Sequence, residues 1–178
     1  GTGERWYVRQ FLFDLLRGCL LAKFPREKAG AHLEVAVHTS VLIRQAVQGI
    51  VALGHTTDLS DADKHKQRKL VLKLLDELLH LLQFWGAPEP CSPQKRTASS
   101  LVRHELYTSF LALASCRHSP EGDITHVLNV GADFDGVVAG MREKLLPVVM
   151  ADVLCNHAQM HSQQDCATRL ASLQVSLY

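Results

Sequence analysis

The densest group of metal-binding residue types lies near the C-terminus, between Cys155 and Cys166. Thiolates and imidazoles are ligands that zinc prefers. His157 and His161 are four residues apart, so on a helix they would share a face, but Cys155 would point almost opposite His157. We expect no bound metal and no other cofactor. The alternative is a small zinc-binding helical domain built on these four residues.

A second candidate metal site is the segment Gly131 to Gly136, which resembles a calcium loop because it contains Asp133 and Asp135. An EF-hand needs an aspartate five residues before its glycine and a glutamate six residues after it. Gly131 and Arg142 occupy those positions, so the match fails. We predict instead that the two aspartates lie at the start of a helix, where negative charge is favourable.

Motifs for catalysis are absent from the sequence. It contains no G-x-S-x-G elbow, no P-loop and no G-x-G-x-x-G loop, so we expect a protein that is not an enzyme. The formal net charge of +1 and the dispersed lysines and arginines give no reason to expect nucleic-acid binding.

One basic cluster stands out, formed by Lys64, Lys66, Arg68 and Lys69. Clustered cations near a surface attract anionic lipid headgroups. Peripheral contact with an anionic membrane is therefore a further alternative. The simpler interpretation is a solvated first turn of a helix.

Residues 86–100 are rich in proline, serine and basic residues, which predicts a flexible linker. Ser92 precedes Pro93, as at sites of proline-directed kinases. Arg96 lies three residues before Ser99, as at sites of basophilic kinases. Ser92 and Ser99 are thus candidate phosphorylation sites.

The stretch from Lys64 to Trp85 contains no glycine or proline and is dominated by leucine. At 3.6 residues per turn, its apolar residues cover an arc of roughly 200°, about twice what a surface helix needs. This pattern predicts the central helix of a stack.

Glu4 to Lys23 is also predicted to be helical, with Pro25 ending it. The inward stripe is predicted to hold six residues: Val8, Phe11, Leu12, Leu15, Leu16 and Cys19. Three further apolar residues lie off this stripe: Trp6, Phe13 and Leu21. Either a second helix covers these three residues, or they form an exposed surface that binds a partner.

Further helices are predicted along the rest of the chain. Glu27 to Leu53 forms one, with a strand near Val35 to Ile43 as a minor alternative. Others are predicted from Ser99 or Ser100 to Cys116, over Ile124–Val130 and over Asp133–Leu146. Another begins at Pro147 as its first residue. The last carries an inward stripe of Cys166, Leu170, Leu173 and Leu177.

These elements predict a single all-α domain over residues 1–178, with six to eight stacked antiparallel helices. Long helices that are polar on one narrow side are typical of layers. The fold is therefore either a segment of a HEAT- or armadillo-like α-solenoid or a layered helical bundle. No residue type recurs at a fixed period, so this prediction depends on the burial pattern alone.

The function predicted from these features is a non-catalytic helical scaffold, or protein–protein interaction module, of a larger intracellular protein. Its partner is another protein or the rest of its own chain. The five cysteines are odd in number and form no CxxC pair, which favours a reducing compartment. We expect a cytoplasmic protein, and the nucleus is equally compatible.

Overall fold

The computed structural model describes residues 2–28, 30–53, 60–86, 93–115, 134–153 and 163–177. Every secondary-structure element assigned in these ranges is a helix, which confirms the predicted all-α class. In chain order the elements are α1 (Thr2–Arg17), the π-helical segment η1 (Gly18–Lys23), α2 (Ala31–Ala52), α3 (Asp61–Gly86), α4 (Pro93–Ala114), α5 (Phe134–Val153) and α6 (Gln163–Leu177).

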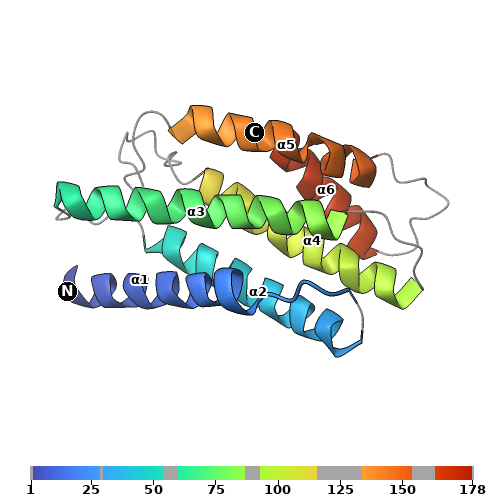
Figure 1. Ribbon diagram of the computed structural model, residues 1–178, viewed down its shortest axis with the longest axis horizontal. Helices are drawn as coiled ribbons and strands as arrows, with labels where there is room; N and C mark the ends of the chain where they lie inside the picture. Colours follow the sequence, from blue (N-terminus) through green and yellow to red (C-terminus); the bar gives the residue numbers. More distant parts are fainter. Residues whose placement is uncertain are drawn as a thin grey trace.

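The helices form three antiparallel pairs that lie in two layers (Figure 1). Within the pairs, α1 packs on α2, α3 on α4, and α5 on α6. Between the pairs, α2 contacts α4 and α4 contacts α6, which makes one continuous layer. In the other layer α3 contacts α5 on one side and η1 on the other.

Helix α3 has the burial that its leucine pattern predicts. Its buried side chains are Val71, Leu74, Leu75, Leu78, Leu79, Leu81, Leu82 and Trp85. Ser60 caps its N-terminus, because the Ser60 hydroxyl accepts a hydrogen bond from the Asp63 amide at 3.2 Å.

Helix α3 lies between α4 and α5 and also contacts η1, as its broad apolar arc predicts, and α4 is centrally placed as well. α4 contacts α2, α3 and α6. Its inward side chains include apolar Val102, Leu106 and Phe110, but also polar Glu105 and Ser109. A hydropathy pattern does not count these polar residues as inward, so it indicates only a single apolar stripe on this helix.

Two helix starts differ from the predicted ones. α2 begins at Ala31 rather than Glu27, because Gly30 has a positive φ of 53° that interrupts the helix. α4 begins at Pro93, so residues 93–100 are helical rather than part of a flexible linker. Proline is favoured at the first helical position, since its missing N–H has no helical partner there. Residues 87–92 of the predicted linker lie outside the described residues.

Pro147 lies inside α5, where the sequence predicted the start of a new helix. Its ring leaves the carbonyl of Glu143 without the usual helical amide. Next to it, the Lys144 carbonyl accepts a hydrogen bond from the Gln83 side chain of α3 at 3.4 Å. Apolar residues on both sides of Pro147, among them Leu145 and Val149, are buried and hold the helix together.

The last helix presents a different face from the predicted one. Its described buried residues are Thr168, Ala171, Ser172 and Val175, whereas Leu170 is exposed. The Cys166 side chain and the Leu177 side chain lie outside the described residues. Thr168 and Ser100 of α4 form a buried hydroxyl pair at 2.8 Å, so small polar residues rather than leucines make this contact.

A short extended segment after η1 crosses onto the C-terminal half of α3. Phe24 packs edge-on against Trp85, with ring centroids 6.4 Å apart. The Lys28 ammonium lies 4.8 Å from the centre of the Phe84 ring. Arg26 pairs with Glu77 at 3.1 Å. We call residues 24–28 the crossing segment.

The close approach of α3 to α5 at Gly86 gives a test of this packing. A Cβ atom at Gly86 would overlap Cγ1 of Val148, which is a stiff β-branched side chain. We expect Gly86→Ala to lower the free energy of unfolding by about 1–3 kcal/mol, measured by urea titration. Gly140→Ala is the control, because a Cβ there meets open space. It should be neutral or stabilising by up to about 1 kcal/mol. Equal effects of the two substitutions would contradict the packing.

Candidate interaction surface

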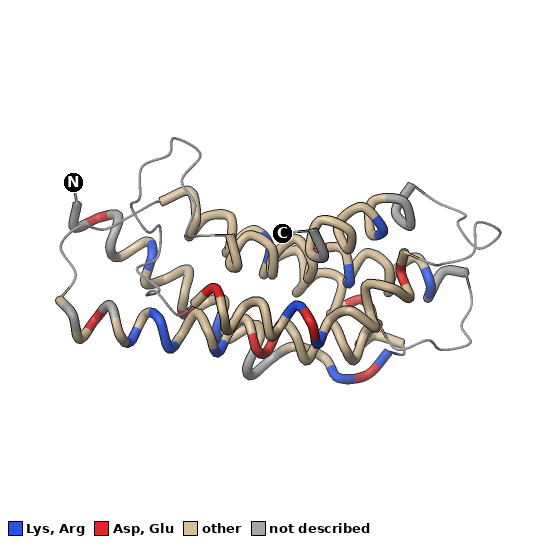
Figure 2. Tube along the Cα trace, turned by 90° about the horizontal axis from the view of Figure 1, so that it is seen from above, with Lys and Arg blue, Asp and Glu red and all other residues tan. Residues whose placement is uncertain are grey.

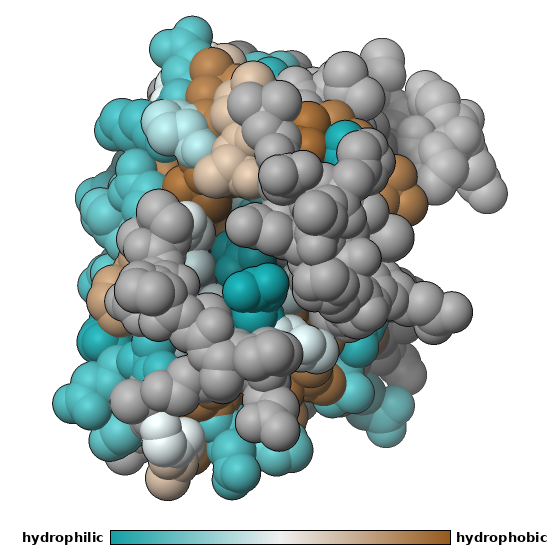
Figure 3. All heavy atoms as spheres, turned by 90° about the vertical axis from the view of Figure 1, so that its right-hand side faces the viewer, coloured by the Kyte–Doolittle hydropathy of each residue, from teal (hydrophilic) through white to brown (hydrophobic). Residues whose placement is uncertain are grey.

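Among the residues whose exposure is described, large apolar side chains are exposed only in the first and last helix pairs. They are Tyr7, Val8, Phe11, Val35 and Leu42 in the first pair, and Val137, Leu146, Met150 and Leu170 in the last. Among the residues whose exposure is described, α3 and α4 contribute none. Figure 3 views one end of the molecule and shows hydrophobic residues toward the top, where α5 lies, and others toward the bottom.

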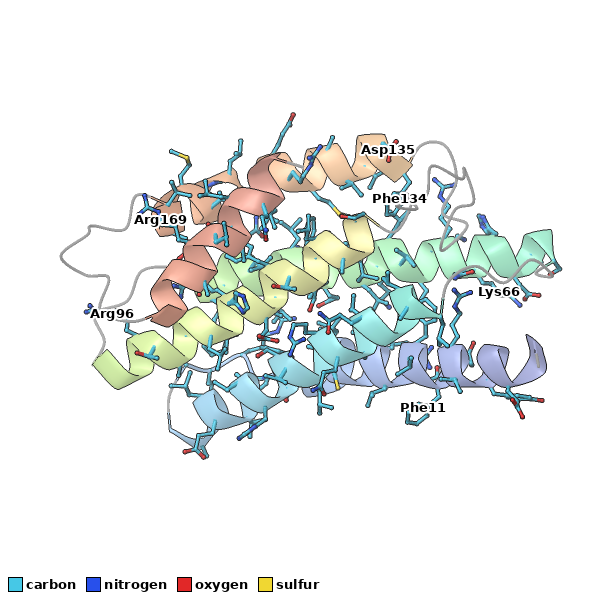
Figure 4. All side chains as sticks on the ribbon, turned by 180° about the vertical axis from the view of Figure 1, so that it is seen from behind. Phe11, Lys66, Arg96, Phe134, Asp135 and Arg169 are labelled. Atoms are coloured by element: carbon cyan, nitrogen blue, oxygen red, sulfur yellow. The ribbon has the colours of Figure 1, made fainter. Side chains whose placement is uncertain are left out.

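Helix α1 is apolar on two opposite sides. Its inner side buries Arg9, Phe13 and Leu16 against the rest of the protein. At the helical period, Tyr7 and Phe11 lie on the opposite side, and they are 71% and 64% exposed. Figure 4 shows Phe11 on the outer edge of α1, pointing away from the other helices.

The predicted surface residues are therefore corrected. Phe13 is 4% exposed and belongs to the core, so it is not part of an outer surface. The side chains of Trp6 and Leu21 lie outside the described residues. Tyr7 was not among the candidates. Val8 and Phe11 were predicted to face inward, but both are exposed.

The signal that could have found this surface is the width of the apolar arc of α1. A polar stripe of Gln10, Asp14 and Arg17 occupies only one narrow side of the helix. The width indicates two apolar contacts, but it does not say which of them lies within the chain. Leu12 packs against Gly49 of α2, where the absent side chain lets the helices approach. That contact helps to fix the rotation of α1.

A polar border lies beside the apolar outer side of α1. Gln10 donates a hydrogen bond to Asp14 at 3.3 Å, and Arg17 pairs with Asp14 at 3.5 Å. Both groups of the ion pair are more than half exposed, so the pair adds little to stability. An aromatic centre with a polar border is the anatomy of many protein–protein contacts. We call Tyr7, Val8 and Phe11 the outer face of α1.

Buried polar groups surround α4. Glu105 pairs with Arg44 of α2 and lies 3.1 Å from the His104 ring nitrogen. Burial alone would raise the pKa of Glu105. The hydrogen bonds from His104 and Arg44, and the charge of Arg44, outweigh burial and lower the pKa below its ordinary value. The carboxylate is thus held ionised between α2 and α4.

A second polar network joins α4 to α5. Asp152 accepts hydrogen bonds from Arg103 Nε at 3.1 and 3.2 Å and from the Tyr107 hydroxyl at 2.8 Å. Arg103 also donates to Ser99 Oγ at 3.0 Å. Burial, together with the neighbouring carboxylate, raises the pKa of Tyr107 above its ordinary value. These residues hold α4 and α5 together.

The candidate chemical sites fall largely outside the described residues. The residues outside the described ranges include Cys155, His157, His161, Ser92 and Asp133, and the side chain of Cys166 is not described either. Within the described ranges, no group of three or more histidine, cysteine, aspartate or glutamate residues could hold a metal ion. Asp135 lies in the first turn of α5, as predicted.

The described residues of the basic cluster of α3 do not all lie on one side of the helix. Lys66 and Lys69 are exposed, and Lys66 pairs with Asp63 at 3.7 Å. Arg68 is half-buried and lies on the side that faces the core, while the Lys64 side chain lies outside the described residues. Figure 2 shows the lysines and arginines along the N-terminal half of α3. Of the four residues in the predicted lipid-binding cluster, only Lys66 and Lys69 are therefore described as exposed.

By length and composition alone, α2 is the one described helix that could cross a membrane. Core helices of soluble proteins pass the same test. Here α2 packs between α1 and α4 and carries the Arg44 pair with Glu105.

No protein-family model matches the chain, and no curated protein or solved structure is significantly similar to it. What the structure defines is therefore a class, an all-α protein of antiparallel helix pairs in two layers.

Two phenylalanine positions, Phe11 and Phe13, test the orientation of α1. Phe13→Ala should lower the free energy of unfolding by roughly 3–5 kcal/mol, because it empties a core position. Phe11→Ala should change it by less than about 1 kcal/mol, because Phe11 is mostly exposed. Chemical denaturation of both variants measures the difference. A larger loss for Phe11→Ala would show that the helix is rotated.

The raised pKa of Tyr107 predicts a loss of stability in alkali. The folded protein keeps the phenol protonated, whereas the unfolded chain ionises it near the ordinary value of 10. The contribution is therefore complete below that pH and is lost as the pH rises above it. Tyr107→Phe should cost about 1–2 kcal/mol at neutral pH and show a shallower decline above pH 10. Parallel alkaline limbs for the two proteins would refute the assignment.

Proposed function

We propose that this chain is a non-catalytic helical scaffold that binds another protein through the outer face of α1. The layered pairs support a short α-solenoid-like stack, because equivalent helices of successive pairs lie side by side. This is seen for α2, α4 and α6 in one layer and for α3 and α5 in the other.

The observation that carries the proposal is the placement of exposed apolar side chains at the two ends of the stack. Helical stacks that end in solution need terminal helices with polar outer sides. Here the first and last pairs expose aromatic and aliphatic residues, whereas the middle pair exposes none among its described residues. Such faces are typical of surfaces that a partner covers.

Within the first pair, the outer face of α1 is the stronger candidate. Tyr7 and Phe11 are one helical turn apart, so their rings lie along the same side of the helix. Aromatic residues supply much of the binding energy in protein–protein contacts. A helical partner with its own apolar stripe fits this shape, because two helices can pack side by side along their length.

The proposal is tested with the triple substitution Tyr7→Gln, Val8→Lys and Phe11→Glu. These residues keep the helix but remove the apolar surface. Proteins captured by the wild-type chain are identified, purified and titrated against each variant. We expect affinity to fall by at least about 30-fold, the effect of losing a hot spot worth about 2 kcal/mol.

The matched control is Lys69→Gln, Lys73→Gln and His80→Gln, which changes three exposed positions on α3. Circular dichroism and the unfolding midpoint check that both triple variants are folded. A partner that binds the wild type and the α3 variant, but not the α1 variant, supports the proposal. A partner that binds both variants equally well contradicts it.

A further inference from the structure

Ser99 lies between two arginines in the second turn of α4. Arg96 precedes it by three residues, which is the spacing of sites for basophilic kinases. Figure 4 shows Arg96 pointing outward from the start of α4. Arg103 follows by four residues, and its Nη1 donates a hydrogen bond to Ser99 Oγ at 3.0 Å.

Arg103 is shared between Ser99 and Asp152 of α5. Its Nε and Nη2 atoms contact the Asp152 carboxylate at 3.0 to 3.2 Å. The side chains of Arg103 and Asp152 are 17% and 12% exposed, so water screens their attraction only partly. A change at Ser99 can therefore alter the contact between α4 and α5.

We propose that Ser99 is phosphorylated by a basophilic protein kinase and that its phosphate draws Arg103 away from Asp152. The kinase transfers the γ-phosphoryl group of a nucleoside triphosphate to Ser99 Oγ. The new Oγ–P bond replaces the bond between the γ-phosphorus and the oxygen that bridges to the β-phosphate. The nucleoside diphosphate leaves, and the hydroxyl proton passes to the kinase base.

The phosphate wins the competition through charge and position. It carries about 1.5 to 2 negative charges at neutral pH, against one on a carboxylate. Positions four residues apart on a helix are neighbours, so Arg103 reaches the phosphate without moving its backbone. Asp152 then keeps its bond from Tyr107 but loses its cation, and it lies near a second anion.

The effect falls on the last turn of α5. Asp152 is the penultimate residue of that helix, and the exposed Met150 is two residues before it. Loss of the ion pair should release this turn from α4. Phosphorylation would then loosen the last helix pair, at the end of the stack that does not carry the outer face of α1.

The acceptor is reachable because it lies near a helix end. Only six residues of α4 precede Ser99, and helix ends open more readily than helix centres. Opening the first two turns of α4 exposes Arg96 and Ser99 together on one extended stretch.

The site is tested by incubating the wild-type chain and Ser99→Ala with ATP and an arginine-directed serine kinase. Mass spectrometry then maps the phosphate. We expect phosphate on Ser99 in the wild type. A synthetic peptide covering residues 93–106 is the control for kinase activity. The site is refuted if the peptide is phosphorylated while the folded chain is not. It is also refuted if the folded chain carries phosphate only on Thr97.

The mechanism is tested by hydrogen exchange of the last-turn amides of α5. Phosphorylated wild type should exchange there at least about tenfold faster than the unmodified chain, as expected for local opening. In Asp152→Asn, which has no carboxylate to lose its cation, phosphorylation should change the same rates by less than about twofold. An equal acceleration in both backgrounds would show that the phosphate merely opens α4, and it would overturn the mechanism.

Discussion

The burial of α4 on three sides is the constraint on which the rest of the structure depends. Because α4 contacts other helices on three sides, its inward polar groups need hydrogen-bond partners, and several of these come from other helices. Arg44 of α2 reaches Glu105, Thr168 of α6 reaches Ser100, and Asp152 of α5 reaches Arg103 and Tyr107. These contacts fix how the three helix pairs lie against one another. They also explain why a helix with few leucines can be the centre of the molecule.

The fold class and the limits of α3 could be predicted because leucine burial dominates that helix. The broad apolar arc from Val71 to Trp85 has few ways to avoid water other than contact with several helices. The central position of α4 could not be predicted in the same way, because its inward residues include a glutamate and serines. Such residues are counted as surface until their partners are known, and those partners lie about 50 to 70 positions away in the chain. The prediction that a new helix begins at Pro147 was wrong for a related reason. Tertiary packing around Leu145 and Val149 overrides the local preference of proline to end a helix.

The outer face of α1 shows what sequence periodicity leaves open. The residues of α1 show that two sides are apolar and that one narrow stripe is polar. Which apolar side faces inward depends on long-range contacts such as that of Leu12 with Gly49. A buried arginine, Arg9, lies on the inner side, whereas Tyr7 and Phe11 lie outside. A hydropathy rule would choose the opposite orientation, because it does not allow for an arginine whose stem packs in the core. The connection between Ser99 and Asp152 also depends on a long-range contact, because it passes through Arg103.

The crossing segment also has a mechanical consequence. It binds α3 by an aromatic contact, a cation over a ring and an ion pair, all within residues 24–28. A pull on α1 would therefore travel along η1 and enter the stack at Trp85, near the C-terminal end of α3. The first helix pair is thus held at two separated points, by α2 on α4 and by this segment on α3. Two points of attachment resist twisting better than one. A load applied to the outer side of α1 would therefore pass into α3 as well as into α4.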